Sequence, residues 1–202
     1  MVLGPDFICV GMQRSGTGWL YDALNNIEIF KMLPIKEIDH FGERHNKHHI
    51  KKLYNANKNK NRILNENEKL IFNNCLNNYI NKNFSNDLYL SLFDVKGINL
   101  SGDITPKYST LGKKDIENIY SFLPNIKIIL ILRNPIERLW SHYNFYLRKK
   151  IKKEKKIKIK EIDLRIITKA SKNFSLNEFI ISKNVIDRSF ASIQFQKWSI
   201  FK

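Results

Sequence analysis

The segment spanning residues 7–20 constrains the fold of this 202-residue chain most strongly. The apolar run at 7–10 (Phe-Ile-Cys-Val) predicts a short strand, and the apolar spacing over 18–26 predicts a helix. Between them lies a loop that carries Arg14 and Gly16. A strand, a glycine-bearing loop and a helix start converge backbone N–H groups and the positive end of the helix dipole on one point. The segment therefore predicts a site for an anionic group such as a phosphate.

The loop differs from the phosphate loop of nucleoside-triphosphate enzymes at one decisive position. Gly11 and Gly16 have the spacing of that loop, which then requires Lys followed by Ser or Thr. Thr17 and Gly18 stand there instead, so the lysine that reaches the outer phosphates is missing, and Arg14 is the available cation. The loop favours a single 5′-phosphate group. A kinase or NTPase relative, and an ordinary strand–turn–helix without a ligand, remain the alternatives.

A second strand–helix junction lies at residues 126–143. The apolar run 126–132 predicts a buried, central parallel strand, and Asn134 is suited to capping the helix that follows. Arg133 ends the strand, where open α/β sheets bind ligands, and Ser141 lies on the helix. An Arg and a Ser so placed can grip a second phosphate. The helix is expected to bury an apolar stripe of Leu139, Trp140, Tyr143 and Leu147.

Together these segments resemble the sulfotransferase family that uses 3′-phosphoadenosine 5′-phosphosulfate (PAPS). That family has an R/K-S/G-G-T loop for the 5′-phosphosulfate and an R-[ND]-P-x-x-R-x-x-S-x-Y segment for the 3′-phosphate; an Arg in the first loop is similar to tyrosylprotein and bacterial members. The resemblance implies a P-loop-like, three-layer α/β fold with a mostly parallel sheet flanked by helices. It also implies that Arg14 stabilises the leaving phosphate, that no metal takes part, and that the product is 3′,5′-ADP. The implied donor-binding residues are Arg14, Ser15, Gly16, Thr17, Gly18, Trp19, Arg133 and Ser141.

Two further segments fit the same resemblance. Residues 34–41 are similar to the K-E-x-[HN]-F-F stretch of glycan sulfotransferases, which implies Glu37 as catalytic base and Lys36 as a substrate contact. His40 departs from that pattern and is a rival catalytic base, because imidazole titrates near neutral pH. Residues 102–109 are similar to the family's G-E-K-[TS]-P-x-Y stretch, which implies substrate contacts from Asp103 and Thr105.

Composition narrows the class of protein. Hydrophobic residues make up 43% of the chain, and no apolar run is long enough for a membrane helix, so we expect one soluble globular domain over 1–202. The first predicted strand starts too close to Met1 for a signal peptide, and the two cysteines are expected to stay reduced, which favours the cytoplasm. The net charge of +16 is compatible with nucleic acid, but much of it lies in the run 148–160, which is typical of a solvated face. Attraction of the charged donor or of an acidic glycan is the functional alternative.

The remaining pattern alternates strands with helices, as in a parallel sheet with covered faces. Predicted are a short strand before Lys36, a helical region over 43–82, a strand at 98–101, and helices around 116–123, after a capping box at 175–178, and over 190–201. The three histidines in the segment 45–49 lack the spacing of a zinc site, so no metal is expected.

The family normally adds a strand and a loop over the adenine. Nothing after Trp198 resembles them, and we therefore expect that part to be missing. A catalytically inactive nucleotide-binding remnant thus remains open beside the enzyme. Glycan, tyrosine, lipid and small alcohol all remain possible acceptors.

Overall fold

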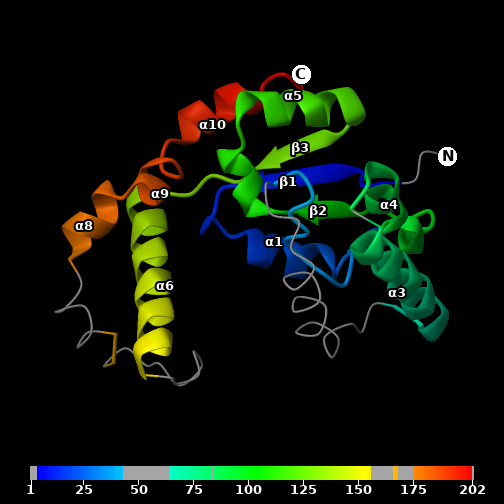
Figure 1. Cartoon of the computed structure of the whole chain (residues 1–202), viewed down its shortest axis with the longest axis horizontal. Coiled ribbons are helices and arrows are strands. Elements are labelled where there is room, and N and C mark those ends of the chain that lie inside the picture. Colours follow the sequence, from blue (N-terminus) through cyan, green and yellow to red (C-terminus); the bar gives the residue numbers. More distant parts are fainter. Residues whose placement is uncertain (1–3, 43–63, 83, 156–165, 168–174, 202) are drawn as a thin grey trace.

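The computed structural model describes residues 4–42, 64–82, 84–155, 166–167 and 175–201 (Figure 1). Its centre is a three-stranded parallel sheet in the order β2-β1-β3, with strands β1 (Phe7–Gly11), β2 (Gly102–Ile104) and β3 (Lys127–Leu130). Every residue of β1 is buried, as expected for the apolar middle strand of such a sheet. The strand predicted at 7–10 is confirmed.

Helices cover both faces of this sheet (Figure 1). Ile8 and Val10 of β1 pack with α5 (Lys113–Phe122) and Trp198 of α10 (Ala191–Trp198), while Cys9 packs toward α1 (Thr17–Leu24). Successive residues of a strand point to opposite faces, so one short strand holds both layers together. The predicted α/β architecture, with a parallel sheet between helices, is therefore observed.

The other helices flank this core. The long helix α6 (Pro135–Lys155) packs through Tyr143 and Leu147 on Phe179 of α8 (Leu176–Ile181), and next to it lies α9 (Lys183–Ile186). Helices α3 (Glu66–Asn81) and α4 (Asn86–Ser91) form a separate core with the segment 33–38 and the 3₁₀-helix η1 (Asp94–Lys96). A second 3₁₀-helix, η2 (Pro106–Thr110), follows β2.

The start of α6 follows its sequence signals. The side chain of Asn134 accepts hydrogen bonds from the backbone N–H groups of Ile136 (3.0 Å) and Glu137 (3.3 Å), which confirms it as the helix cap. The predicted apolar stripe is only partly buried, because Trp140 is 59% exposed.

Three strand predictions need correction. β3 lies at the edge of the described sheet and is only half-buried, because β1 alone has a described strand on each side. The chain before Lys36 forms a single bridge, between Phe30 and Leu100, and then a loop. The strand expected at 98–101 begins at Gly102, since the chain first turns at Gly97 (φ 56°) and leaves Ile98 96% exposed.

Candidate active site

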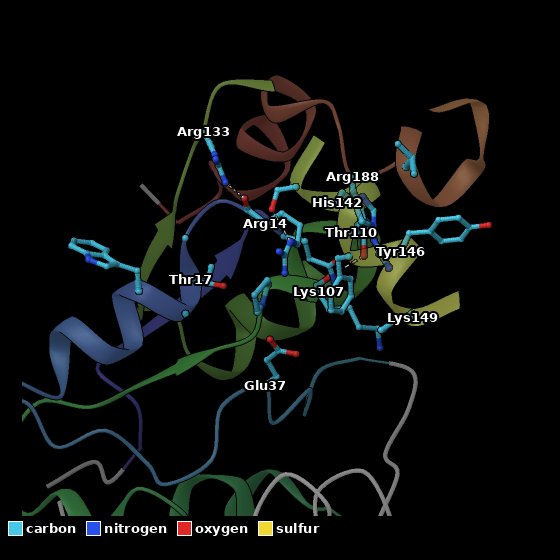
Figure 2. A pocket seen from close by; sticks show the side chains of 18 of the residues that line it. Arg14, Thr17, Glu37, Lys107, Thr110, Arg133, His142, Tyr146, Lys149 and Arg188 are labelled. Carbon is cyan, nitrogen blue, oxygen red and sulfur yellow. Dashed lines mark hydrogen bonds between the residues drawn. The ribbon is translucent and has the colours of Figure 1, made fainter. Parts of the chain in front are cut away.

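One large pocket opens where the carboxyl ends of β1 and β3 meet (Figure 2). Its walls are the β1–α1 loop, residues 36–37, η2, the middle of α6 and the segment 179–188. The open pocket has a volume of about 1,090 Å³. Small-molecule sites occupy about 300–1,000 Å³, so this pocket lies at the large end of that range.

The β1–α1 loop is shaped to receive an anion. Arg14 (φ 67°) and Gly16 (φ 101°) both adopt left-handed backbone conformations, which turn successive N–H groups toward one side. A Cβ atom added to Gly16 would meet nothing within 4 Å, so glycine serves the conformation here. Gly16, Thr17 and Gly18 line the pocket at the start of α1, and Trp19 lines it with a largely exposed ring. The donor-binding prediction for this loop therefore has a suitable geometry, except that Ser15 is buried and lies outside the pocket wall.

Arg14 joins the two segments that the sequence predicts to bind phosphate. Its Nε donates a hydrogen bond to Ser141 Oγ at 3.1 Å, and its guanidinium lies over the ring of Phe145. Partial burial and the charge of Arg133 lower the pKa of Arg14. Arg133 in turn donates to the backbone oxygen of Arg14 at 3.4 Å and to Glu137 Oε2 at 3.1 Å. Three of the predicted phosphate contacts, from segments far apart in sequence, thus meet in one pocket.

Lys36 and Glu37 also line the pocket, and Figure 2 shows the Glu37 carboxylate across from Arg14. The backbone N–H of Glu37 donates to the carbonyl of Ile104 at 3.1 Å, and its left-handed conformation (φ 64°) directs the residue away from the sheet. Its side chain is 47% exposed and lies 3.6 Å from Lys36 Nζ. The loop therefore presents a solvent-accessible carboxylate to the pocket, beside a cation.

His40, the rival base, lies elsewhere. Its side chain is only 4% exposed and is stacked on the ring of Tyr89. Both ring nitrogens are engaged, Nδ1 with the hydroxyl of Tyr79 at 2.8 Å and Nε2 with Asn86 Oδ1 at 3.0 Å. The structure does not bring His40 to the pocket, because the left-handed turn at residues 37–39 sends it into the core beside α3 and α4.

Asp103 and Thr105 also lie outside the pocket, contrary to the substrate-contact prediction. Asp103 is buried and accepts hydrogen bonds from Thr105 Oγ1 (2.7 Å), Tyr108 (2.9 Å) and Tyr89 (3.2 Å). Burial raises the pKa of Asp103 to about 6, and these hydrogen bonds oppose the rise. Both residues therefore hold the end of β2 in place.

The neighbouring residues of η2 line the pocket in their stead. They are Pro106, Lys107 and Thr110, of which Lys107 pairs with Asp39 at 2.5 Å. The sequence reasoning missed Lys107, although Pro106 is suited to the first position of a helix and so signals the short helix that carries Lys107.

The far side of the pocket was also missed. α6 contributes His142, Phe145, Tyr146 and Lys149, and the segment after α9 contributes Arg188. The last three of these α6 residues could have been found by extending the helix face from His142 by three, four and seven positions, which gives Phe145, Tyr146 and Lys149. Arg188 has no comparable signal.

Comparison with known proteins identifies the family. The sequence model described as "Sulfotransferase domain" matches residues 4–182. The chain belongs to the sulfotransferase family. It is therefore an enzyme of sulfuryl transfer, and the family resemblance found in residues 7–20 and 126–143 is confirmed. A search of curated proteins finds no match.

The described residues of this sulfotransferase were compared with two kinds of feature, a membrane-spanning helix and a metal site. None of the helices among them is both long and apolar enough to cross a membrane. Within the same ranges, no three His, Cys, Asp or Glu side chains gather as ligands for a metal ion. The histidines at 45–49 lie outside these ranges.

Proposed function

We propose that this sulfotransferase takes its sulfuryl group from PAPS and transfers it to a hydroxyl group of an acceptor, with 3′,5′-ADP as the second product. One observation carries the proposal: Arg14 of the β1–α1 loop is hydrogen-bonded to Ser141 of α6, beside Arg133. Two proposed phosphate sites, the β1–α1 loop with Arg14 and the pair of Arg133 and Ser141, therefore lie in one pocket. A donor with phosphates at both its 5′ and 3′ positions fits two such sites better than a single triphosphate does.

The residues present suit such a donor. The open space over Gly16 leaves the loop N–H groups accessible to a 5′-phosphate, and the start of the eight-residue helix α1 adds its dipole. Arg133 and Ser141 supply a bidentate cation and a hydroxyl for the 3′-phosphate. When bound, PAPS supplies a sulfuryl group activated by its bond to the 5′-phosphate oxygen.

The chain's own groups then have defined roles. Glu37 takes the proton of the acceptor hydroxyl as its oxygen bonds to sulfur. Breakage of the bond between sulfur and the bridging oxygen leaves an electron pair on the 5′-phosphate, and Arg14 with the loop N–H groups stabilises that charge. Lys36, 3.6 Å from the Glu37 carboxylate, holds that side chain toward the loop. Glycan, tyrosine and small-alcohol hydroxyls are all candidates for this reaction.

A thermal-shift comparison of 3′,5′-ADP, 5′-AMP and Mg-ATP tests the donor class. A ligand that binds only the folded state at a hundredfold excess over Kd stabilises by about 2.7 kcal/mol. We expect the largest increase in melting temperature with 3′,5′-ADP, because only this nucleotide occupies both proposed phosphate sites. An equal or larger shift with Mg-ATP would contradict the proposal and favour a kinase or NTPase. Mass spectrometry of a hydroxyl-compound panel incubated with PAPS then separates an enzyme from a binding protein without turnover.

A further inference from the structure

The pocket has a second end, formed by α6 and the segment 179–188. Figure 2 shows His142, Tyr146, Lys149 and Arg188 gathered there, on the opposite side of the pocket from Arg133. Arg14 lies between Arg133 and this cluster, and Glu37 lies below Arg14 with its carboxylate toward it (Figure 2). The second end is therefore where an acceptor can extend from the reacting centre.

Cations dominate this second end. Arg188 and Lys149 line it, and Glu37 is the one carboxylate among the described residues that form the pocket wall. Asp187, adjacent to Arg188, is exposed and lies outside that wall. A cluster of one sign in a concave site concentrates ions of the opposite sign.

A buried arginine behind the pocket wall adds to the excess of positive charge at this end. Arg138 lies one turn before His142 on α6 and is only 2% exposed. Its Nη2 donates to Ser189 Oγ at 2.8 Å, but Nε and Nη1 have no partner among the described residues. Nδ1 of His142 is likewise buried and without a described partner. Buried charges are normally paired, so a wall with unpaired N–H groups next to a cavity fits an anionic ligand.

Burial and the same charges set the protonation state of His142. Burial, followed by the charges of Arg188, Arg138, Arg14 and Lys149, lowers its pKa from the ordinary value of 6.5 to about 4. The imidazole is therefore neutral at neutral pH and can donate one hydrogen bond without adding a repulsive charge. Aromatic rings complete this end: Phe145 and Tyr146 line it, and the cations of Arg14 and Lys149 lie over the ring of Phe145.

Resting on the proposed function, we propose that this second end selects an acceptor bearing an oxyanion, either a carboxylate or a sulfate. The anionic group is bound by Arg188 and Lys149, while the reacting hydroxyl reaches Glu37. Guanidinium groups bind such planar or tetrahedral oxyanions through paired hydrogen bonds. Of the two side chains, Lys149 lies within residues 4–182, which the family model matches, and Arg188 lies after them.

The experiment uses sulfate as the probe, with the donor end saturated by 3′,5′-ADP and ionic strength held constant with chloride. Calorimetric titration should show sulfate binding to the nucleotide-bound wild type. Arg188→Gln should weaken it by roughly tenfold, the loss of about one charge-assisted contact. Lys152→Gln removes an equal charge from an exposed position on α6 outside the pocket and should leave the affinity unchanged. Acetate, titrated in the same way, indicates whether the site prefers a carboxylate or a sulfate.

Three results would overturn the proposal. One is the absence of sulfate and acetate binding above the chloride control, and another is equal weakening by Arg188→Gln and Lys152→Gln. The third is a selective loss of 3′,5′-ADP affinity over 5′-AMP affinity in Arg188→Gln, which would assign Arg188 to the donor. Should Arg188→Gln not fold, Lys149→Gln, at an exposed position, takes its place with the same expectation. If 3′,5′-ADP itself does not bind, the proposed function fails, and titration of the nucleotide-free protein still compares Arg188→Gln with Lys152→Gln.

Discussion

Two clusters of buried polar side chains flank the pocket, and they differ in how completely they are paired. Asp103 is 1% exposed and accepts hydrogen bonds from Thr105, Tyr108 and Tyr89. Arg138 is 2% exposed, yet two of its three guanidinium nitrogens have no partner in the described part of the chain. Burial is thus equal, and pairing is not.

This difference indicates two roles: the paired cluster around Asp103 supports the structure, and the incompletely paired Arg138 lies where a ligand can bind. The Asp103 cluster also receives the backbone N–H of Asp39 on Thr105 Oγ1 and that of Phe41 on Tyr108, so it fixes the loop that presents Glu37. A buried network with every member satisfied rigidifies its surroundings. Unsatisfied groups beside a cavity cost stability, and such local conflicts are expected where a ligand completes the network.

The largest effect is expected at Glu37, which lies on the loop between the clusters. Glu37→Gln keeps the shape of the side chain and removes its basicity, so turnover should fall about 10²- to 10⁴-fold. Affinity for 3′,5′-ADP, measured by calorimetry, should not change. The matched variant is His40→Ala in the paired cluster, which should lower the free energy of unfolding and leave turnover per folded molecule nearly intact. The opposite pattern, an active Gln variant and an inactive folded Ala variant, would transfer the base role to His40.

Asp103→Ala should have the next largest effect, on stability. It leaves the hydroxyls of Thr105, Tyr108 and Tyr89 without their acceptor, and each unmade buried hydrogen bond costs about 1–3 kcal/mol. Removing a desolvated carboxyl offsets part of this, so we expect a net loss of about 3 kcal/mol by urea denaturation at pH 5. Asp22→Ala, at an exposed position on α1, should change the free energy by less than about 0.5 kcal/mol. Equal losses in the two variants would mean that pairing in the cluster contributes nothing.

Arg133 tests the donor end of the pocket. Arg133→Ala should weaken 3′,5′-ADP by about 1.5–3 kcal/mol, the value of a hydrogen bond to a charged group, and 5′-AMP by much less. The measurement is the ratio of the two dissociation constants. Arg188→Gln serves as the control because its charge lies at the other end of the pocket and should leave that ratio unchanged. A proportional loss for both nucleotides would show that Arg133 does not contact the 3′-phosphate.

The sequence predicted local features of the fold well. The strand at 7–10, the cap at Asn134 and the helices after both loops depend on residues close in sequence, and the structure has them. The position of β3 at an edge and the loop around Lys36 depend on partners far along the chain. Apolar runs do not specify such partners, because a buried strand and a half-buried one have similar composition.

The site residues also divide into those that the local sequence predicts and those that distant contacts position. Arg14, Arg133 and Ser141 lie on motifs whose spacing fixes their approximate direction, and they line one pocket. His40 and Asp103 lie on matching stretches too, but the left-handed turn at 37–39 and the buried network direct them inward. One-letter patterns do not record which side of a loop faces the core.

A pH titration measures how strongly the folded protein shifts the protonation of Asp103 in the paired cluster. Burial raises the pKa of Asp103 from its ordinary value of 3.8 to about 6, so the folded state favours the protonated form. The stabilisation that protonated Asp103 provides is complete below pH 3.8 and is lost as the pH rises through 6. The destabilisation caused by Asp103→Ala should therefore be about 1 kcal/mol smaller at pH 7.5 than at pH 5. If the destabilisation caused by Asp103→Ala instead grows with pH, the folded state favours the ionised form of Asp103.

The smallest effect is expected where a buried arginine is removed. Arg138→Met deletes the hydrogen bond to Ser189, but it also deletes a charge whose other nitrogens have no described partner. Replacing incompletely paired buried charge by an apolar side chain of similar length is often neutral or stabilising, so the free energy of unfolding in chloride should stay within about 1 kcal/mol of the wild type. Ser189→Ala keeps the Arg138 charge and removes this hydrogen bond, together with the one that Ser189 Oγ donates to the Val185 carbonyl. Sulfate should then stabilise the wild type more than Arg138→Met, because an anion compensates a charge that only the wild type carries. A loss of several kcal/mol in chloride, on the scale expected for Asp103→Ala, would mean that Arg138 is as fully paired as Asp103, and the distinction between the two clusters would not hold.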